Sequence, residues 1–525
     1  MRTGGWADGR KGGWRFALGL LLSLYPAIRL SAQCPDGTPP PCRQPARAAI
    51  VPNSVAVLYF DNLSADTADA YLADGLTDEI IARLGQIERL KVKSRMAVAR
   101  YRTTTLDPSQ LGRALSVGYL VNGTVRRGAA RLRVTVELLR ATNGNRVWGQ
   151  QYDRTDADLL AIEEDIGSAV VTAIAGRLAP AERASLAARP TRSPAAYDHF
   201  LRGNYALAQR SEAGLASAIA EHQVALQLDS TFTAALSGIA YAYALYLNAG
   251  WTVPGLPAES LLSRGMALAD HALAQDSASS DAWMTRGLLL EFRNPLTFRG
   301  VREAFERSIA LNPENAEAHH QFGTALLRLG EDSAAEAAFR RALALDPTRP
   351  VTLRNIGWLR LSQRAYTDAL RWVDSALVAD STFVLAHLER ARLERFLGNV
   401  AGVRRDADAL ARFATTPGTR RLAEDARVWA DAAAGDTLAA RARAERLFQE
   451  MAASDSARSS LGFRDRAYLA LALVAAGEVD QALSTLALGS PSGLLLWPFL
   501  RSPEFDVIRD QPRFQRLVEE IRPSR

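Results

Sequence analysis

Histidine and cysteine, the residues that most often bind metals or perform thiol chemistry, are scarce in this chain. Its 525 residues include six histidines and two cysteines. His319 and His320 are neighbours, but adjacent residues on a helix point about 100° apart, so they would not hold one ion together. The other histidines are scattered, with no motif around them: His199, His222, His271 and His387. The sequence therefore predicts no metal site, and we expect no cofactor.

Carboxylates in residues 54–180 are the next candidates for chemistry. Asp61, Asp74, Asp78, Glu79 and Asp153 could act as acids or bases, but this region contains no histidine or cysteine. No Gly-rich phosphate loop follows its first expected strand. We interpret Asp61 as a turn residue before a helix, and Asp78 with Glu79 as a solvated helix face. The sequence thus predicts no catalytic residue, and an enzyme with an unrecognised site stays an alternative.

Basic side chains form the third candidate group, and almost all of them are arginine. Only three of the 63 basic residues are lysines (Lys11, Lys91 and Lys93), against 57 acidic residues, and the net charge is +6. Codon composition is one explanation; selection for recognising carboxylates or phosphates, which arginine does better than lysine, is the other. Residues 1–33 hold a net charge of +4, which leaves +2 for the remainder. The charge therefore does not predict a nucleic-acid partner.

Residues 1–33 have the pattern of a secretory signal. A basic start precedes the apolar run 16–28, and small residues follow near Ala32, which is the order found in cleaved signal peptides. Pro26 and Arg29 shorten the run below the ~20 apolar residues that a membrane helix needs. We predict an exported, periplasmic or cell-envelope protein. An uncleaved segment anchored in the inner membrane is the alternative.

Both cysteines lie in a Cys/Pro-rich linker, residues 34–52. Cys34 and Cys42 flank a Pro-Asp-Gly turn signal, which brings neighbouring residues together. In an oxidising compartment the pair could close a small disulfide loop. Two unpaired thiols, or a lipoprotein modified at Cys34, are the alternatives.

Residues 53–185 alternate between strand and helix patterns. The run 54–60 is short and apolar, as in a buried strand, and 131–139 has the period of two of a half-buried one. Further strands are expected at 90–94, 119–125 and 146–152. Helices are expected over 68–87 and 157–178, with a third beginning at Asp107. These elements predict an α/β domain.

Four segments of this region resemble one bacterial module. They read SVAVLYFDNLS (54–64), ADGLTDEII (73–81), GYLVNGTVR (118–126) and VWGQQYDR (147–154). The set is similar to the amino-terminal domain of the TolB protein and to the flagellar outer-membrane protein FlgO. In signalling proteins this module commonly lies between an effector (an adenylate cyclase, a winged-helix DNA binder or a Ser/Thr kinase) and a tetratricopeptide array. The resemblance implies a noncatalytic module, and we expect no effector in this chain.

Residues 196–525 repeat with the period of tetratricopeptide units. Similar Ala/Leu-rich phrases end at Asp276, Asn312, Asp346 and Asp380. Their spacing is close to the length of one such helix-turn-helix unit, about 34 residues. The clearest unit is 316–347. Its signature residues are Phe322, Gly323, Leu326, Gly330, Ala335, Phe339, Ala342 and Pro347. The predicted fold class is therefore an α/β module followed by an all-α solenoid, 196–525, mostly helical, with a C-terminal cap.

Such arrays curve, and in this family the first helix of each unit lines a concave groove. The family's groove positions place an arginine-rich set with interleaved aromatic and aliphatic side chains there. The residues are His320, Thr324, Leu327, Arg328, Arg354, Trp358, Leu361, Arg392 and Arg395. Arginines with interleaved apolar residues could hold an acidic or extended peptide. A solvated helix face with ordinary arginines is the alternative.

These patterns favour a noncatalytic, exported scaffold that binds a protein or peptide. The oligomeric state is open, and the N-terminal segment could anchor the chain to a membrane. The resemblance also suggests a sensory or regulatory half of a signalling system that partners a separate kinase or cyclase. DNA binding is disfavoured because no helix-turn-helix motif or basic stripe precedes the α/β region.

Overall fold

The computed structural model describes residues 51–99, 101–102, 104–128, 131–155, 158–251, 253, 256–453, 462–488 and 493–523. The chain divides into two units, Met1–Ala49 and Ile50–Arg525, and the described residues all belong to the second. The predicted signal segment (1–33) and the disulfide between Cys34 and Cys42 lie outside the described residues, as does most of the predicted linker (34–52).

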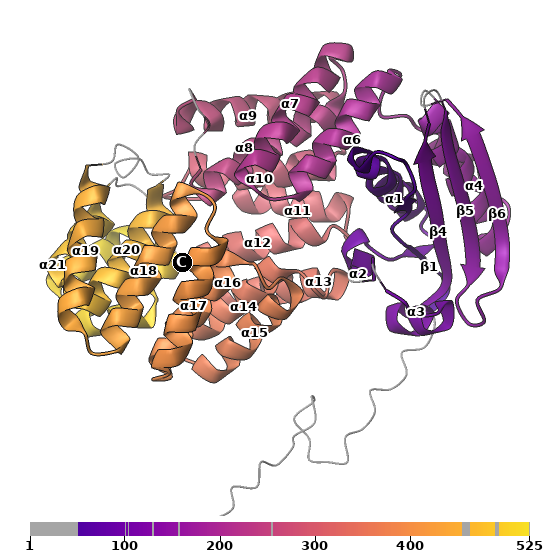
Figure 1. Cartoon of the computed structure of the whole chain (residues 1–525). Coiled ribbons are helices and arrows are strands. Elements are labelled where there is room, and N and C mark those ends of the chain that lie inside the picture. The colour runs from indigo at the N-terminus through magenta and orange to yellow at the C-terminus, as the bar shows by residue number, and fades with distance from the viewer. Residues whose placement is uncertain are drawn as a thin grey trace, which may run out of the picture. The chain divides into compact units, whose positions relative to one another are not determined.

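A six-stranded mixed sheet forms the core of the α/β module (Figure 1). Its strands are β1 (Val51–Val57), β2 (Asp61–Asn62), β3 (Lys91–Val92), β4 (Val117–Arg127), β5 (Leu132–Arg140) and β6 (Arg146–Arg154). The order is β3-β1-β4-β5-β6, with β2 beside β4. β1 runs parallel to β3 and β4, whereas β4, β5 and β6 are antiparallel neighbours. Strands β1, β3, β4, β5 and β6 overlap the segments that the sequence patterns predicted, whereas β2 was not predicted: Asp61, interpreted as a turn residue, pairs with β4 instead.

Five helices accompany this sheet. They are α1 (Ala70–Gly85), α2 (Arg95–Ala99), α3 (Pro108–Leu115), α4 (Leu159–Ala175) and α5 (Pro180–Ala187). Val55 and Val57 of β1 pack in one cluster with α1 and α4, whereas Ala56 packs in another with α2 and α3, because successive side chains of a strand point to opposite faces. Asp107 begins α3 as expected: its carboxylate accepts from the backbone N–H of Gln110, 2.9 Å away.

A buried polar contact joins this module to the helices that follow. Arg83 on α1 donates to the Leu186 carbonyl at 2.6 Å and lies 3.3 Å from Glu163 on α4. Burial raises the pKa of Glu163, and the hydroxyl of Tyr197 donates to this carboxyl at 2.9 Å. Tyr197 belongs to the first helix of the array, so that helix is part of the module's packing.

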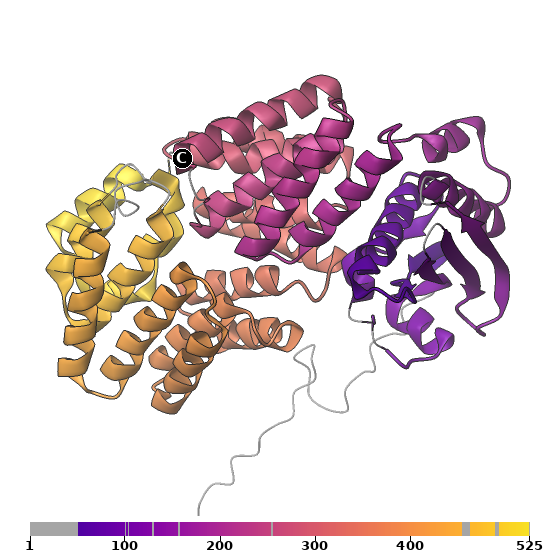
Figure 2. The same cartoon turned by 45° about the horizontal axis from the view of Figure 1, so that its top comes forward.

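The array consists of antiparallel helix pairs stacked side by side (Figures 1 and 2). The helices are α6 (Pro194–Ala208), α7 (Glu212–Leu228), α8 (Thr233–Ala249), α9 (Ala258–Gln275), α10 (Ser280–Arg293), α11 (Val301–Leu311), α12 (Ala316–Arg328), α13 (Asp332–Leu345), α14 (Pro350–Ser362), α15 (Tyr366–Ala379), α16 (Val384–Phe396), α17 (Val400–Phe413), α18 (Pro417–Ala433), α19 (Thr437–Ala452), α20 (Phe463–Ala476) and α21 (Val479–Ala487). The first residues of α12, α14 and α16 recur at the spacing that the sequence period predicted.

Close packing within the pairs α12/α13 and α14/α15 depends on a glycine opposite a large side chain. A Cβ atom on Gly323 would lie 2.7 Å from the ring of Phe339, and one on Gly357 would lie 2.7 Å from Val373. Phe339 and Val373 are fully buried. The small residue therefore lets the two helices approach until the large one fills the space between them, which is the packing expected for the 316–347 unit.

The C-terminal residues return along the array instead of only covering its last pair. They form a short 3₁₀ turn (Gly493–Leu495), α22 (Trp497–Leu500), a second 3₁₀ turn (Pro503–Ile508) and α23 (Pro512–Ile521). The backbone N–H of Leu494 donates to the Pro295 carbonyl at 2.7 Å. Arg501 donates to Asp332 on α13 at 2.7 Å.

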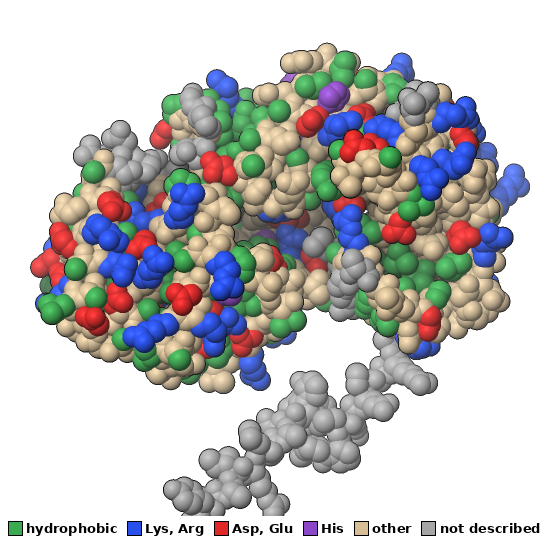
Figure 3. Space-filling view, viewed as in Figure 1, with side chains coloured by type: hydrophobic (Ala, Val, Ile, Leu, Met, Phe, Trp, Pro, Cys, Tyr) green, Lys and Arg blue, Asp and Glu red, His purple; other side chains and the backbone are tan. Residues whose placement is uncertain are grey.

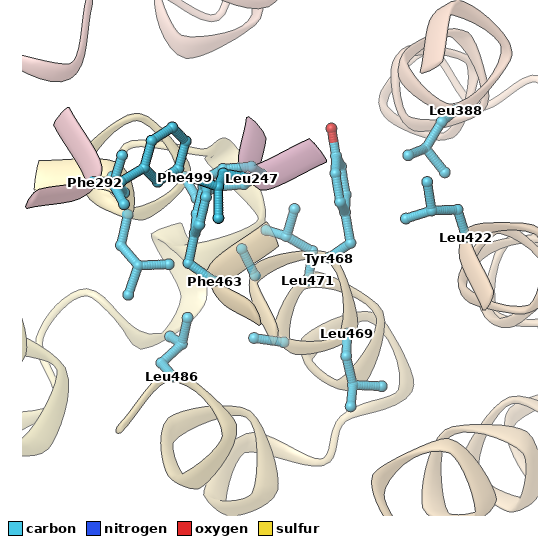
Figure 4. Close-up of a cluster of buried hydrophobic side chains, with 14 of the residues drawn as sticks. Leu247, Phe292, Leu388, Leu422, Phe463, Tyr468, Leu469, Leu471, Leu486 and Phe499 are labelled. Carbon is cyan, nitrogen blue, oxygen red and sulfur yellow. The ribbon is translucent and has the colours of Figure 1, made fainter. Parts of the chain in front are cut away.

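The cluster under this segment is apolar. Figure 4 shows Phe499 of α22 beside Phe463 of α20, Phe292 and Leu247. In the same cluster, Leu388 of α16 and Leu422 of α18 point toward each other. Residues from early, middle and late repeats therefore share one core, and the segment 493–508 closes it.

Candidate peptide-binding face

Six of the nine predicted groove positions are buried and do not line an open groove: His320, Leu327, Arg328, Arg354, Leu361 and Arg392. We call the set of charged and aromatic side chains that includes Arg328, Arg354 and Arg392 the inner face. It is defined by Glu291, Arg328, Arg354, Trp358, Glu389, Arg392, Arg395, Arg464 and Tyr468. These residues come from α10, α12, α14, α16 and α20. The first helix of each repeat supplies them, because side chains three or four residues apart point to the same side of a helix.

Arg392 makes the densest set of contacts on the inner face. Its Nε and Nη2 donate to the two carboxylate oxygens of Glu504 at 2.7 and 2.9 Å, and Nη2 also donates to Ser502 at 3.1 Å. Its Nη1 donates to Glu389 at 2.6 Å. The side chains of Arg392 and Glu504 are both 0% exposed. A bidentate contact of this kind, with two parallel hydrogen bonds, is the strongest arrangement of a guanidinium and a carboxylate.

Glu389 connects Arg392 to the next arginine. Arg354 donates to Glu389 at 2.9 Å and to the hydroxyl of Tyr468 at 2.8 Å, and Tyr468 in turn donates to Glu389 at 2.7 Å. Burial alone would raise the pKa of Glu389, but Arg392 and Arg354 outweigh it and hold that pKa below its usual value. Glu389 is therefore ionised at neutral pH and shared by two cations.

Arg328 forms a separate pair at the other end of the inner face. Its Nη1 donates to Glu291, and its Nη2 donates to the side chain of Asn248 at 3.3 Å. Burial raises the pKa of Glu291, and Arg328 opposes that shift. Arg328 is thus committed to a buried carboxylate of the preceding repeat.

Four of the other predicted positions are apolar or neutral: His320, Thr324, Leu327 and Leu361. Nδ1 of His320 lies 2.9 Å from the hydroxyl of Thr352, and burial lowers the pKa of His320 to about 3, which keeps it neutral. Thr324 donates to the His320 carbonyl and accepts from an asparagine amide. Leu327 and Leu361 are buried in the core.

Trp358 lies at the contact with the C-terminal segment. Its ring centroid is 4.6 Å from that of Phe499, with the two planes inclined at 64°. The guanidinium carbon of Arg354 lies 4.7 Å from the Trp358 centroid. This indole therefore has an aromatic partner on one side and a cation close to its ring, a geometry that favours both contacts.

Two arginines of the inner face have no such partner. Among the described residues, the guanidinium of Arg395 makes no hydrogen bond or ion pair and lies 5.3 Å from the Phe396 ring centroid. Burial lowers the pKa of Arg395. Arg464 on α20 is also without a hydrogen bond or ion pair to any described residue, and burial lowers its pKa to about 10.

The structure thus joins Arg354 and Arg392 through Glu389, leaves Arg328 and Arg395 outside that contact, and adds residues that the repeat pattern did not identify. These are Glu389, Tyr468, Ser502, Glu504 and Arg464. Glu389 lies three residues before Arg392 on the same helix, a spacing that predicts contact. Glu504 lies 112 residues from Arg392, and no local pattern predicts that approach.

Four of the five candidate carboxylates of the α/β module are engaged in ion pairs, namely Asp74, Asp78, Glu79 and Asp153. Asp78 lies 2.8 Å from Arg95, and Glu79 lies 3.1 Å from Arg83; both carboxylates are half-buried rather than solvated as the sequence suggested. Asp74 is buried and accepts from Arg102 at 2.5 and 3.0 Å. Within the described ranges, no group of three or more His, Cys, Asp or Glu residues could hold a metal ion.

A cavity of about 300 Å³ lies where this module meets α6. Its lining is mainly apolar and includes Leu72, Leu160 and Tyr197, with Arg127 and Asp198 also lining it. Asp198 accepts from the hydroxyl of Tyr71 at 2.5 Å, and Arg127 donates to the same hydroxyl at 2.8 Å. The polar groups of this cavity therefore already bind one another.

No helix in the described parts of the chain combines the length and the apolar character needed to span a bilayer. On the face drawn in Figure 3, basic and acidic side chains are interspersed over the helices of the array. Charges of both signs alternate there, unlike the continuous basic surface that a nucleic acid needs.

No family model matches the sequence. A curated protein of Rhizobium meliloti (strain 1021) named "Putative adenylate cyclase 3" is 30% identical over 258 residues, which are 49% of this chain. The chain spans only 42% of that relative's length.

Solved structures with similar folds include several tetratricopeptide proteins. One of Thermus thermophilus is 21% identical and matches 38% of this chain and 98% of its own, at a TM-score of 0.32. Pseudomonas aeruginosa PilF is 16% identical; the match covers 43% of this chain and 95% of PilF, at a TM-score of 0.32. The type IV pilus biogenesis factor PilW is 20% identical; the match covers 42% of this chain and 96% of PilW, at a TM-score of 0.34. The regular repeat period and the glycine-packed helix pairs α12/α13 and α14/α15 give the array the pattern of tetratricopeptide repeats, and the array follows an N-terminal α/β module.

Proposed function

We propose that this protein is a noncatalytic scaffold of the cell envelope that binds acidic, extended segments of partner proteins on its inner face. The observation that carries this proposal is the chain's own segment 493–508, which already lies on that face. Glu504 is held by Arg392, and Phe499 packs on Trp358. The inner face is therefore complementary to a segment that combines a carboxylate with an aromatic side chain.

The chemistry of this contact supports recognition in addition to stability. A guanidinium removed from water fixes both the position and the direction of a carboxylate. Arginine and tryptophan are also the residues that most often dominate binding energy at protein interfaces. A partner with the same two features could occupy the inner face beside the internal segment or in its place.

The α/β module is proposed to be noncatalytic. Asp74, Asp78 and Glu79, the carboxylates that could have served as acids or bases, each have an arginine partner. Burial nevertheless raises the pKa of Asp78 to about 7 and the pKa of Glu79 above its usual value, so the proposal rests on the arginine partners of these carboxylates and not on their ionisation.

Regulation of a signalling system is the second candidate function. The curated relative carries the name of an adenylate cyclase, and about half of this chain is similar to it. In this proposal the chain would be a sensory or regulatory partner of a separately encoded kinase or cyclase. Loss of the gene should then change the cellular cyclic AMP level or the phosphorylation of a target protein.

Photo-crosslinking in the native bacterium tests the scaffold proposal. A crosslinking amino acid is placed at Thr324, a half-buried predicted groove position one turn before Arg328 on α12. In a matched variant it is placed at Val378 on α15, which is 88% exposed. We expect discrete products from position 324 that are absent from position 378. Equal labelling at both positions, or no product from either, would contradict the proposal.

Cell fractionation tests the location. We expect the protein in the periplasmic or envelope fraction, and N-terminal sequencing should show a start near Gln33. A cytoplasmic, full-length protein would refute export without affecting the binding proposal.

A further inference from the structure

The sheet of the α/β module ends in a long, exposed edge strand, β6. It is the last strand in the order β3-β1-β4-β5-β6, and Figure 1 shows it as the outermost strand, beyond β5. It is nine residues long, most of them exposed, and among the described residues no strand pairs with its outer side. Backbone N–H and C=O groups on the outer side of an edge strand can pair with a strand of another chain.

The two edges of this sheet differ in the features that prevent such pairing. The opposite edge strand, β3, consists of Lys91 and Val92 alone, and Lys93 follows it directly. A very short strand and lysine side chains both protect an edge against pairing with other chains. β6 contains no lysine and no proline, and its residues 147–152 carry no charge. These two protections are therefore present at β3 and missing at β6.

A β-bulge in β6 decides which of its side chains share a face of the sheet. Trp148 lies opposite Leu138 of β5, and Arg146 lies opposite the adjacent Leu139. Val147 therefore has no partner on β5 and is the extra residue of the bulge. Because side chains of a regular strand alternate between faces, Arg146 and Trp148 would otherwise share a face, and the bulge moves Arg146 to the other one.

Each face of β6 carries one pair of complementary side chains. Trp148 and Tyr152 lie on the face that packs against the core formed with α1 and α4. Arg146 and Asp153 lie on the other face, where each contacts an oppositely charged side chain of β5. Both pairs are centred on Gln150. Trp148 and Tyr152 are two positions from it, and Arg146 and Asp153 are three positions from it when the bulged residue is left out of the count.

We propose that β6 pairs with β6 of a second copy of this chain, in an antiparallel ladder around a twofold axis at Gln150. In this register Trp148 of each copy lies opposite Tyr152 of the other, and Arg146 of each copy lies opposite Asp153 of the other. Residues that are opposite each other in an antiparallel ladder point to the same face. The bulge makes this possible for both pairs at once.

The choice of a second copy as the occupant follows from the self-complementarity of this register. A twofold interface repeats every contact, so the aromatic pair and the ion pair would each form twice. Arg146 would lie between Glu137 of its own chain and Asp153 of the second copy, so that charges of opposite sign alternate across the interface. The interface uses no residue of the inner face, and this inference is therefore independent of the proposed binding function.

Sedimentation of the purified full-length chain measures the association. We expect a monomer–dimer equilibrium in the micromolar range, because the interface is small. A chain that stays monomeric at ~100 µM would overturn the proposal.

Charge reversals at the two ends of β6 test the register. Arg146→Asp would place two carboxylates opposite each other at both ends of the ladder, and Asp153→Arg would do the same with two guanidinium groups. Each variant should dimerise about 10-fold or more weakly, since like charges directly opposite each other are destabilising. Arg404→Asp is the matched control, because Arg404 is exposed on α17 and the change in net charge equals that of Arg146→Asp. Equal weakening in this control, or unchanged dimerisation of the β6 variants, would overturn the proposal.

A mixture of the Arg146→Asp and Asp153→Arg variants tests the pairing directly. One variant carries carboxylates at both positions and the other carries guanidinium groups at both, so every opposite pair in a mixed dimer is again complementary. We expect the mixture to recover the association that each variant alone has lost. Absence of recovery would overturn the proposal, because the complementarity of this register is its basis.

Hydrogen exchange of the unmodified protein locates the interface without any substitution. Backbone amides of β6 should exchange about 10-fold more slowly at a concentration where the dimer predominates than at one where the monomer does. Protection confined to other elements would overturn the proposal even if the variants did not fold. Protection of β6 that appeared only after a different protein was added would also overturn it, because the occupant would then be a foreign strand.

Discussion

Replacement of Glu504 by glutamine isolates the contact between the array and its own C-terminal segment. Glutamine keeps the size of the side chain and one oxygen acceptor, and it removes the negative charge. Arg392 would keep Glu389 at 2.6 Å and Ser502 at 3.1 Å as hydrogen-bond acceptors. The change therefore tests the ion pair itself with little disturbance of packing.

The size of the effect follows from the burial of the pair. Removing one partner of a buried ion pair generally costs ~3–5 kcal/mol, because the other charge is left uncompensated. Here Glu389 still neutralises part of Arg392, and the glutamine oxygen still accepts one hydrogen bond. We therefore expect Glu504→Gln to reduce the stability of this region by about 2–3 kcal/mol.

Hydrogen exchange is the assay that resolves where this loss occurs. A local loss of about 2 kcal/mol accelerates exchange about 30-fold, since each 1.4 kcal/mol is a factor of ten. The acceleration should appear in residues 493–508 and in α16, which carries Arg392, and be much smaller in the sheet of the α/β module. Chemical unfolding followed by circular dichroism gives the corresponding global change.

Glu519→Gln is the matched control, because Glu519 is exposed on α23 and has no ion pair among the described residues. It should change stability by less than ~0.5 kcal/mol, as surface substitutions usually do. If Glu504→Gln behaves like this control in both exchange and unfolding, the ion pair does not hold the segment. The proposal that the inner face selects carboxylates would then lose its main support.

Three further substitutions test other parts of the structure. In Gly203→Ala, the added methyl group would lie 2.5 Å from the buried ring of His222, so despite the better helix propensity of alanine we expect a loss of ~1–3 kcal/mol in denaturant unfolding. Burial raises the pKa of Asp425 to about 7, above its unfolded value. The protonated carboxyl is tolerated at low pH, its destabilising effect grows as pH rises from the unfolded pKa to about 7, and that effect is complete above 7. In denaturant unfolding, Asp425→Asn should therefore stabilise the protein by up to ~4 kcal/mol at pH 8 and by almost nothing at pH 4. Arg392→Lys should reduce the free energy of unfolding by at least ~2 kcal/mol, because an ammonium cannot reproduce the bidentate contact with Glu504. The control Arg371→Lys, at a side chain that is 76% exposed, should reduce it by less than ~0.5 kcal/mol. Equal reductions would contradict a geometric role for Arg392.

Much of the fold follows from patterns of neighbouring residues. The repeat period, the glycines opposite Phe339 and Val373, and the alternation in β5 are local signals, and the corresponding elements lie where they were expected. The solvated face predicted for Asp78 and Glu79 was wrong for a tertiary reason. α6 packs on α1, so closely that a Cβ atom on Gly75 would lie 2.9 Å from Leu201.

The inner face was predictable only in part. Repeat register placed Arg328, Arg354 and Arg392 on it, because register depends on the sequence within each unit. Residues 493–508 cover the inner face, and they are more than a hundred residues away from Arg392 in the sequence. No local sequence pattern predicts a contact over that separation.

The excess of arginine over lysine has different explanations at different positions. Arg392 uses three of its nitrogens to reach four acceptor contacts, with both oxygens of Glu504, Ser502 and Glu389. A lysine has one nitrogen at the end of a flexible stem, so it could satisfy these acceptors only in turn. Arg404, which is exposed and unpaired among the described residues, uses none of this geometry, and codon composition is a sufficient explanation there. The inner face is thus the place where the identity of arginine, and not only its charge, determines what can bind.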